Sequence, residues 1–346
     1  MLTNSWANIQ RRKTNLRKTN LLILFFTVIL MLSLFACSTN TNLETVRVAE
    51  VTRSIFYTPQ YVALEKGLFE DEGLDIKLET TWGGDKTMTA LLSDSSDIAL
   101  VGSETSIYVY AQGTNDRVIN FAQLTQTDGT FLLAREKPKK FDWEQIKGST
   151  FLGQRKGGMP QMVGEYVLKK HNIDPQKDVD LIQTVDFGNI PNAFASGTGD
   201  YVQLFEPTAS IFEQEGIGHI VASFGEESGH IPYTTFMAKQ SYLKDNEETI
   251  EKFIRALYKA QQWVEKNDAK TIAKVVEPYF DDTDIKILTK VIDRYKKQGS
   301  FATDLKMNED GWYRLQEMME EAGELPERVP YDKLVNTRLV EKVLEK

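Results

Sequence analysis

The order of apolar and polar residues along the chain predicts alternating strands and helices. Residues 45–51 (TVRVAEV) alternate and are rich in valine, as is typical of a strand with one buried face. A helical stretch at 59–66 ends at Gly67. The alternation continues with strands at 75–80, 98–101 and 118–124 and helices at 86–92 and 106–111. This order predicts a parallel sheet covered by helices.

The same alternation starts again after residue 130. Strands are expected at 131–134, 151–153, 179–184, 201–205, 220–223 and 234–238. Helices are expected at 161–171, 190–195 and 209–215. From Glu247 onward the signals are helical, and residues 249–266 place their apolar side chains on one helix face. The chain therefore reads as two α/β units followed by C-terminal helices.

The beginning of the chain differs from the rest. Residues 11–18 contain five basic residues and no acid, and residues 21–35 are almost wholly apolar, which is the order of a secretory signal. The apolar run is short for a helix that crosses a membrane. It ends in Leu-Phe-Ala-Cys37 before a polar stretch.

This junction resembles the bacterial lipobox. The resemblance implies cleavage before Cys37 and a diacylglyceryl thioether on its sulfur, with stable anchoring by the acyl chains. We therefore expect a lipoprotein signal peptide at 1–36, a tether at 37–44, and a protein held on the outer face of a bacterial cell membrane (the periplasmic side in a Gram-negative cell). The alternative is a structural cysteine at the end of an uncleaved anchor helix.

Composition removes several classes of protein. Hydrophobic residues make up 41% and charged residues 26%, which is typical of a globular chain. The formal net charge of -9 speaks against a nucleic-acid partner. A single cysteine excludes an internal disulfide and a zinc site built from paired cysteines, and the three histidines are scattered. We expect no bound metal and no cofactor. We also expect the protein to be a monomer.

Residues 60–78 (QYVALEKGLFEDEGLDIKL) resemble the first helix and second strand of the solute-binding proteins of nitrate, sulfonate and taurine import. That family includes proteins similar to thiamine-pyrimidine precursor binders. Shorter matches occur at Gly83-Gly84, at 96–99 (SDIA), and at 199–207, which ends in Glu206-Pro207.

The resemblance implies an α/β, two-lobed periplasmic-binding-protein-like fold with an interlobe ligand cleft and C-terminal helices. It also implies delivery of a small-molecule ligand to an ABC permease and its ATPase subunits. We expect residues 45–125 and 241–346 to form the first lobe with the C-terminal helices, and 126–240 to form the second lobe.

Candidate ligand contacts follow from where the strands end. Ligands of open parallel sheets lie beyond the carboxyl ends of the strands, where helices begin and their free N–H groups favour anionic or polar groups. The residues expected there are Phe56, Tyr57, Trp82, Gly83, Ser103, Glu104, Thr105, Gln126, Arg155, Gly157, Met159, Phe187, Asn189 and Glu206.

Several of these candidates also have a structural interpretation. Phe56 could pack under the following helix, Trp82 could belong to the core, and the Ser103 hydroxyl could cap a helix. Arg155 could be a solvated charge on a surface turn. The ligand class also stays open. Glu206 with nearby aromatic residues suits a neutral or cationic heteroaromatic ring, whereas Arg155 suits a sulfonate or carboxylate. The number of aromatic residues at strand ends favours a pyrimidine-like vitamin precursor.

Two other functions compete with import. Some relatives of this fold make a pyrimidine in a reaction that consumes a histidine and needs iron, and they carry a cysteine-rich motif. Cys37 is the only cysteine here, so we do not expect an enzyme. A sensor domain that signals through a receptor would share the fold and the cleft, and the sequence leaves it open.

Overall fold

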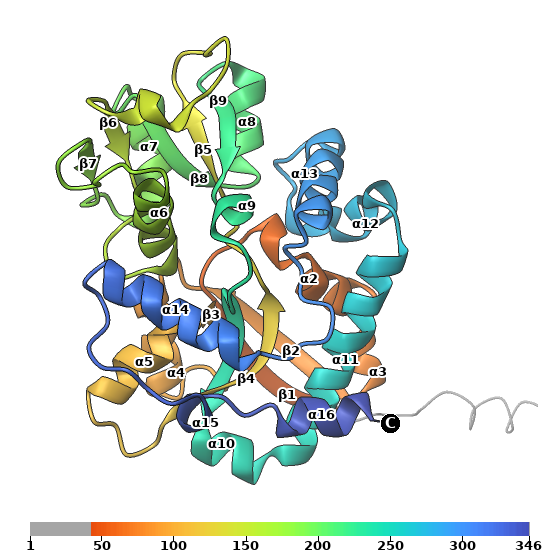
Figure 1. Cartoon of the computed structure of the whole chain (residues 1–346). Helices are drawn as coiled ribbons and strands as arrows, with labels where there is room; N and C mark the ends of the chain where they lie inside the picture. The colour runs from red at the N-terminus through yellow and green to blue at the C-terminus, as the bar shows by residue number, and fades with distance from the viewer. Residues whose placement is uncertain (1–42, 346) are drawn as a thin grey trace, which may run out of the picture. The chain divides into compact units, whose positions relative to one another are not determined.

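In the computed structural model the described residues are 43–345, so Cys37 and the predicted signal peptide lie outside them. The described part contains two five-stranded sheets (Figure 1). The first has the order β2-β1-β3-β10-β4, with β1 (Glu44–Glu50), β2 (Leu74–Thr80), β3 (Ile98–Gly102), β4 (Val118–Thr125) and β10 (Thr234–Lys239). The second has the order β7-β6-β8-β5-β9, with β5 (Thr130–Ala134), β6 (Thr150–Leu152), β7 (Asp180–Ile182), β8 (Tyr201–Phe205) and β9 (His219–Ser223).

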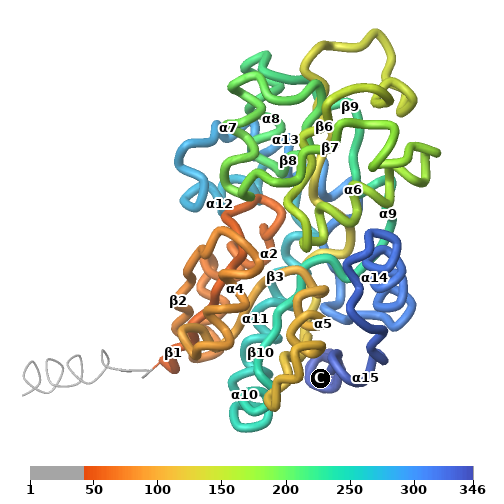
Figure 2. The backbone as a smooth tube through the Cα atoms, turned by 90° about the vertical axis from the view of Figure 1, so that its left-hand side faces the viewer, coloured from red at the N-terminus to blue at the C-terminus, as the bar shows by residue number. Residues whose placement is uncertain are grey.

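Helices cover both sheets, and we call each sheet with its helices a lobe (Figures 1 and 2). The first lobe holds α2 (Thr58–Glu65), α3 (Leu68–Asp71), α4 (Gly84–Leu92) and α5 (Glu104–Ala111). The second holds α6 (Met159–Lys170), α7 (Ile190–Ala195), α8 (Thr208–Glu215) and α9 (Phe224–Ser228). Short 3₁₀ helices lie at Ile55–Tyr57, Trp143–Ile146, Phe187–Asn189 and Glu277–Tyr279. The predicted two-lobed α/β fold is confirmed.

The C-terminal part is helical, as predicted. It comprises α10 (Gln240–Asp245), α11 (Glu247–Lys266), α12 (Ala269–Val276), α13 (Ile285–Gln298), α14 (Glu309–Glu321), α15 (Tyr331–Leu334) and α16 (Arg338–Leu344). Helix α11 buries Ile250, Phe253, Ile254 and Leu257 on the face that the apolar spacing indicates. None of the helices within residues 43–345 combines the length and the apolar character needed to cross a membrane.

Two expectations about the sheets need correction. The sheets are mixed rather than parallel, because β10 runs antiparallel to β3 and β4, and β5 runs antiparallel to β8 and β9. Strand β10 was expected in the second lobe, within 126–240, but it pairs in the first sheet. The chain crosses back between the lobes at residues 229–233, and the nearly fully buried strand then inserts between β3 and β4.

The chain crosses between the lobes twice, after β4 and before β10, and the two crossing segments lie side by side. The backbone N–H of Ile231 donates to Gln126 O at 3.0 Å, and that of Tyr233 donates to Thr125 O at 3.2 Å. At the open edge of the first sheet, β4 is buried because C-terminal residues cover it: Gln123 N–H donates to Leu305 O at 2.8 Å.

Candidate functional site

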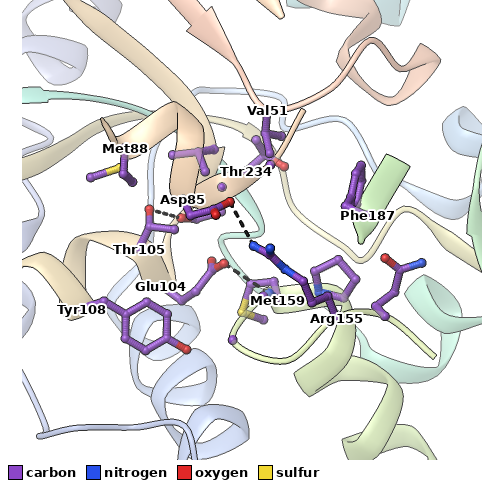
Figure 3. Close-up of a pocket in the computed structure, with 18 of the residues that line it drawn as sticks. Val51, Asp85, Met88, Glu104, Thr105, Tyr108, Arg155, Met159, Phe187 and Thr234 are labelled. Carbon is purple, nitrogen blue, oxygen red and sulfur yellow. Dashed lines mark hydrogen bonds and ion pairs between the residues drawn. The ribbon is translucent and has the colours of Figure 1, made fainter. Parts of the chain in front are cut away.

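A cavity of about 570 Å³, which we call the main cavity, lies between the two lobes (Figure 3). Its first-lobe wall comes from the residues after β1 and from the beginnings of α4 and α5. Its second-lobe wall comes from the loop 154–160, Phe187 and Phe205. Strands β1, β3, β6 and β8 all end at this space, which is where ligands of α/β sheets bind.

Glu104, the first residue of α5, reaches from the first lobe to the second. Its Oε1 accepts a hydrogen bond of 3.1 Å from the backbone N–H of Met159, the first residue of α6 (Figure 3). The residue is only 3% exposed, and Oε2 has no hydrogen-bond partner in the described part of the chain. Burial raises the pKa of Glu104 to about 7, although the hydrogen bonds from its own amide and from Met159 oppose the shift. Its charge therefore changes near neutral pH.

Gly102 makes room for this carboxylate. A Cβ at position 102 would lie 2.2 Å from Oε2 and 2.5 Å from Oε1 of Glu104. Any larger residue at the end of β3 would displace the acid from its place against α6. The carboxylate position is thus set by the backbone on one side and by the α6 amide on the other.

Arg155 forms a second link across the main cavity. Its Nη2 lies 2.9 Å from Oδ1 of Asp85, in the first turn of α4 (Figure 3). Its Nη1 lies 3.6 Å from Oδ1 of Asp186. The guanidinium is half exposed, so these ion pairs hold its position more than they stabilise the fold. A carboxylate of the chain thus takes part in each of these two contacts across the main cavity.

The rest of the wall combines aromatic and apolar side chains with polar ones, among which Lys156 and Glu324 are charged. Phe187 and Phe205 have ring centroids 5.9 Å apart, and Tyr57 lies on the opposite side with 3% exposure. Burial raises the pKa of Tyr57 far above its usual value, so its hydroxyl stays protonated. A space of this size and lining suits a small organic molecule with a flat apolar body and a few polar groups.

The structure brings eight of the fourteen candidate residues to the main cavity. They are Tyr57, Gly83, Glu104, Thr105, Arg155, Gly157, Met159 and Phe187. Each follows a strand or begins a helix, as the sequence interpretation requires.

The other six candidates do not line this cavity. Phe56 is fully buried in an aromatic cluster with Tyr295 and Tyr233, so it belongs to the core and not to the cavity wall. The Ser103 hydroxyl donates to Pro232 O, and Gln126 Nε2 donates to Gly299 O at 2.9 Å. Asn189 is exposed outside the cavity.

Trp82 and Glu206 line a smaller cavity of about 470 Å³ next to the first. Trp82 is 50% exposed, which excludes the core interpretation. Glu206 is fully buried, and the guanidinium of Arg294 from α13 binds its carboxylate. Its Oε2 also accepts a 2.8 Å hydrogen bond from Ser210 N–H in α8. Glu206 therefore holds α8 and α13 together.

Sequence reasoning missed several wall residues. Asp85 directly follows the predicted glycine pair, Phe205 ends β8, and Gln154 lies two residues after β6, so the strand-end rule could have included them. Tyr108 lies one helical turn after Glu104, on the same face of α5. Glu324 comes from the segment after α14, and no local pattern points to it.

The chain matches the model of the NMT1-like family over residues 42–277. The chain belongs to this family. A protein of Bacillus subtilis (strain 168) named "Putative binding protein YtlA" is 66% identical over 316 residues, which is 91% of this chain and 95% of that protein.

Solved structures share the fold. The nitrate-binding protein NrtA of Synechocystis PCC 6803 superposes with a TM-score of 0.72 at 17% identity, covering 88% of this chain and 89% of its own. The alkanesulfonate-binding protein SsuA of Xanthomonas axonopodis pv. citri superposes with a TM-score of 0.68 at 16% identity, covering 85% and 98%. The desulfurization enzyme DSZB also shares it. The NMT1-like chain thus has the periplasmic-binding fold.

Within residues 43–345, no group of three or more His, Cys, Asp or Glu side chains could hold a metal ion.

Proposed function

We propose that this NMT1-like protein is the extracytoplasmic solute-binding component of an ABC importer. It captures a small organic solute in the main cavity and delivers it to a permease with its ATPase subunits. The observation that carries the proposal is a cavity of about 570 Å³ between two lobes that touch across it through Glu104–Met159 and Asp85–Arg155. Contacts of this kind let occupancy of the cavity determine how the lobes are held, which a permease can recognise.

The lining favours a ring-bearing solute, such as a pyrimidine-like vitamin precursor. Tyr57, Phe187 and Phe205 offer aromatic faces, and only a few polar groups lie between them. An aliphatic sulfonate is the alternative, supported by Arg155 in the wall and by the fold shared with the alkanesulfonate-binding protein SsuA, whose solved structure is bound to MOPS. A sensor with the same cavity would bind the same solute but would not need a permease.

Small molecules released from the purified full chain and identified by mass spectrometry test this function. We expect one organic compound in near-stoichiometric amount, and its re-addition at 100 times Kd should stabilise the protein by about 2.7 kcal/mol. Gly84→Leu should abolish binding, because a Cβ there has only ordinary contacts and a longer side chain extends into the main cavity. Gly188→Leu, beside the smaller cavity, should leave binding intact.

Two results would contradict the function. One is a chain that carries and binds no small molecule of any class. The other is binding that Gly188→Leu abolishes and Gly84→Leu does not. If a strain lacking the protein imports the identified solute normally, the sensor interpretation replaces import.

We also propose attachment through a lipid on Cys37, since the body of the chain is acidic and has little attraction for anionic headgroups. Cys37→Ser is expected to move the protein from the membrane fraction to the soluble fraction after cell breakage. Mass spectrometry of the wild-type N-terminal peptide should show acylated Cys37 as the first residue. A Cys37→Ser variant that stays in the membrane fraction would refute this attachment.

A further inference from the structure

The main cavity contains buried hydrogen-bond acceptors that the chain leaves unused. Of the buried side-chain atoms without a partner in the described part of the chain, Glu104 Oε2, Gln154 Oε1 and the Tyr233 hydroxyl belong to residues that line this cavity. The Tyr233 hydroxyl interacts with the Asp128 carboxylate beside it. Glu104 Oε2 and Gln154 Oε1, on residues that are each 3% exposed, have no partner within residues 43–345. A buried acceptor left unpaired costs the fold free energy, so a pair of them facing one cavity indicates a ligand that donates.

The chemistry of both groups fixes them as acceptors. Gln154 Nε2 donates to the backbone carbonyl of Gln203 at 2.6 Å, and a carbonyl can only accept, so Gln154 Oε1 is the free atom. Glu104 uses Oε1 for the Met159 amide and keeps Oε2 free. One acceptor comes from each lobe, so a ligand that donates to both would bridge the lobes.

The cavity carries more carboxylates than cations, because Asp85, Glu104 and Glu324 line it together with Arg155 and Lys156. An anion would be expected at the N-terminus of the 12-residue helix α6, but the Glu104 carboxylate holds the first amide there. An anion would also be expected at Arg155, but Asp85 and Asp186 hold its guanidinium. An incoming sulfonate or nitrate would have to displace these carboxylates and then lie next to Glu104.

Given that the main cavity is the solute site proposed above, we propose that its ligand carries at least two N–H donor groups and no negative charge. An amino-substituted heteroaromatic ring, an amidinium or a guanidinium fits this description. Glu104 and Gln154 are the residues that determine specificity, with one N–H on Glu104 Oε2 and another on Gln154 Oε1. The flat body of the ligand lies against Tyr57, Phe187 or Phe205.

The charged and titratable groups around Glu104 agree with this class. Tyr57, Tyr108 and Tyr233 face it and remain protonated, because burial and the Glu104 charge raise their pKa values. Asp85 and Arg155 pair with each other next to it, and Lys156 and Glu324 line the same cavity. Since the pKa of Glu104 is raised to about 7 in the ligand-free site, affinity for a cation should fall as pH drops below 7.

Calorimetry on the full chain in detergent tests this inference with matched probes. Benzamidine is compared with benzoate and benzenesulfonate, and 4-aminopyrimidine with pyrimidine; the compound that co-purifies is assayed beside them. We expect the aminated member of each set to bind at least 10-fold more tightly. Glu104→Gln keeps an acceptor for the Met159 amide but replaces the free oxygen, so donor affinity should fall about 10- to 100-fold. Gln154→Met should also weaken it.

Glu317→Gln, an exposed change of the same chemistry on α14, serves as the control and should leave binding unchanged. The inference is overturned if the co-purified compound is an anion, or if benzoate or benzenesulfonate binds more tightly than benzamidine and Glu104→Gln strengthens that binding. In that case the importer function still stands. If no probe binds and nothing co-purifies, the proposed function itself fails.

Discussion

Replacing Arg294 by methionine is expected to lower the free energy of unfolding by about 3–5 kcal/mol at pH 7, because it leaves the buried Glu206 carboxylate without its cation. Glu206 has no exposed side-chain surface, and the Arg294 guanidinium that binds it also lies over the Phe131 ring, 4.9 Å from its centroid. Even with Arg294 present, burial raises the pKa of Glu206. The two hydrogen bonds from Ser210 cannot replace the lost charge.

Urea unfolding of matched variants measures this loss. Arg328→Met removes the guanidinium from an exposed pair with Glu320 and should cost no more than about 1 kcal/mol. The double variant Glu206→Gln/Arg294→Met has no buried charge left, so it should recover much of the stability that Arg294→Met loses. Losses of equal size at Arg294 and Arg328 would show that water reaches Glu206 and that the pair is not a buried one.

The Glu206–Arg294 pair shows where prediction from the sequence ends. The strand-end rule correctly placed Glu206 after β8, but the residue that decides its role lies 88 positions later. Nothing in the local pattern around Arg294 indicates a partner, because helix α13 reaches the second lobe only through the tertiary fold. A buried acid at a strand end can serve a ligand or a helix, and only its neighbours decide which.

Local signals predicted more reliably. The apolar spacing of α11, and Gly67 with φ of 66° at the end of α2, follow from backbone geometry within one turn. Glu104 and Arg155 were found because each lies two or three residues after the end of a predicted strand. Their interlobe contacts with Met159 and Asp85 depend on how two separate sheets face each other, which strand periodicity does not encode. The same holds for the direction of β10, which the crossing segments determine.

The stability of the ligand-free protein is expected to rise as pH is lowered from about 8 to about 5. Burial is the largest cause of the raised pKa of Glu50, Glu104, Asp128 and Glu206, which reaches about 7 for Glu104 and about 6 for Asp128. Unfolded, these groups titrate near 4.5 for Glu and 3.8 for Asp. At a pH between the unfolded and the folded pKa values, the folded chain holds protons that the unfolded chain has lost, so the free energy of unfolding falls as pH rises.

Acids whose pKa values are lowered on folding do not change this dependence between pH 5 and pH 8. Glu72, Glu213 and Glu227 have lowered pKa values, for which their hydrogen bonds and ion pairs with basic side chains outweigh partial burial. The stability they add is lost only as pH falls below about 4.5, through their folded pKa values. The maximum of stability should therefore lie near pH 5, below the neutral range.

Glu104 alone should account for about 3 kcal/mol of this dependence, from a pKa that rises from 4.5 to about 7. Glu104→Gln cannot ionise, so urea unfolding between pH 5 and 8 should show a flatter profile and a variant more stable than wild type at pH 8. Glu317→Gln should keep the wild-type profile. If the wild type is equally stable at pH 5 and pH 8, water reaches the Glu104 carboxyl and its pKa is not raised. Suppose that Glu104→Gln both flattens the dependence of stability on pH and loses affinity for donor ligands. The chain then keeps a carboxylate that destabilises it at neutral pH because ligand binding, and not the fold, requires that carboxylate.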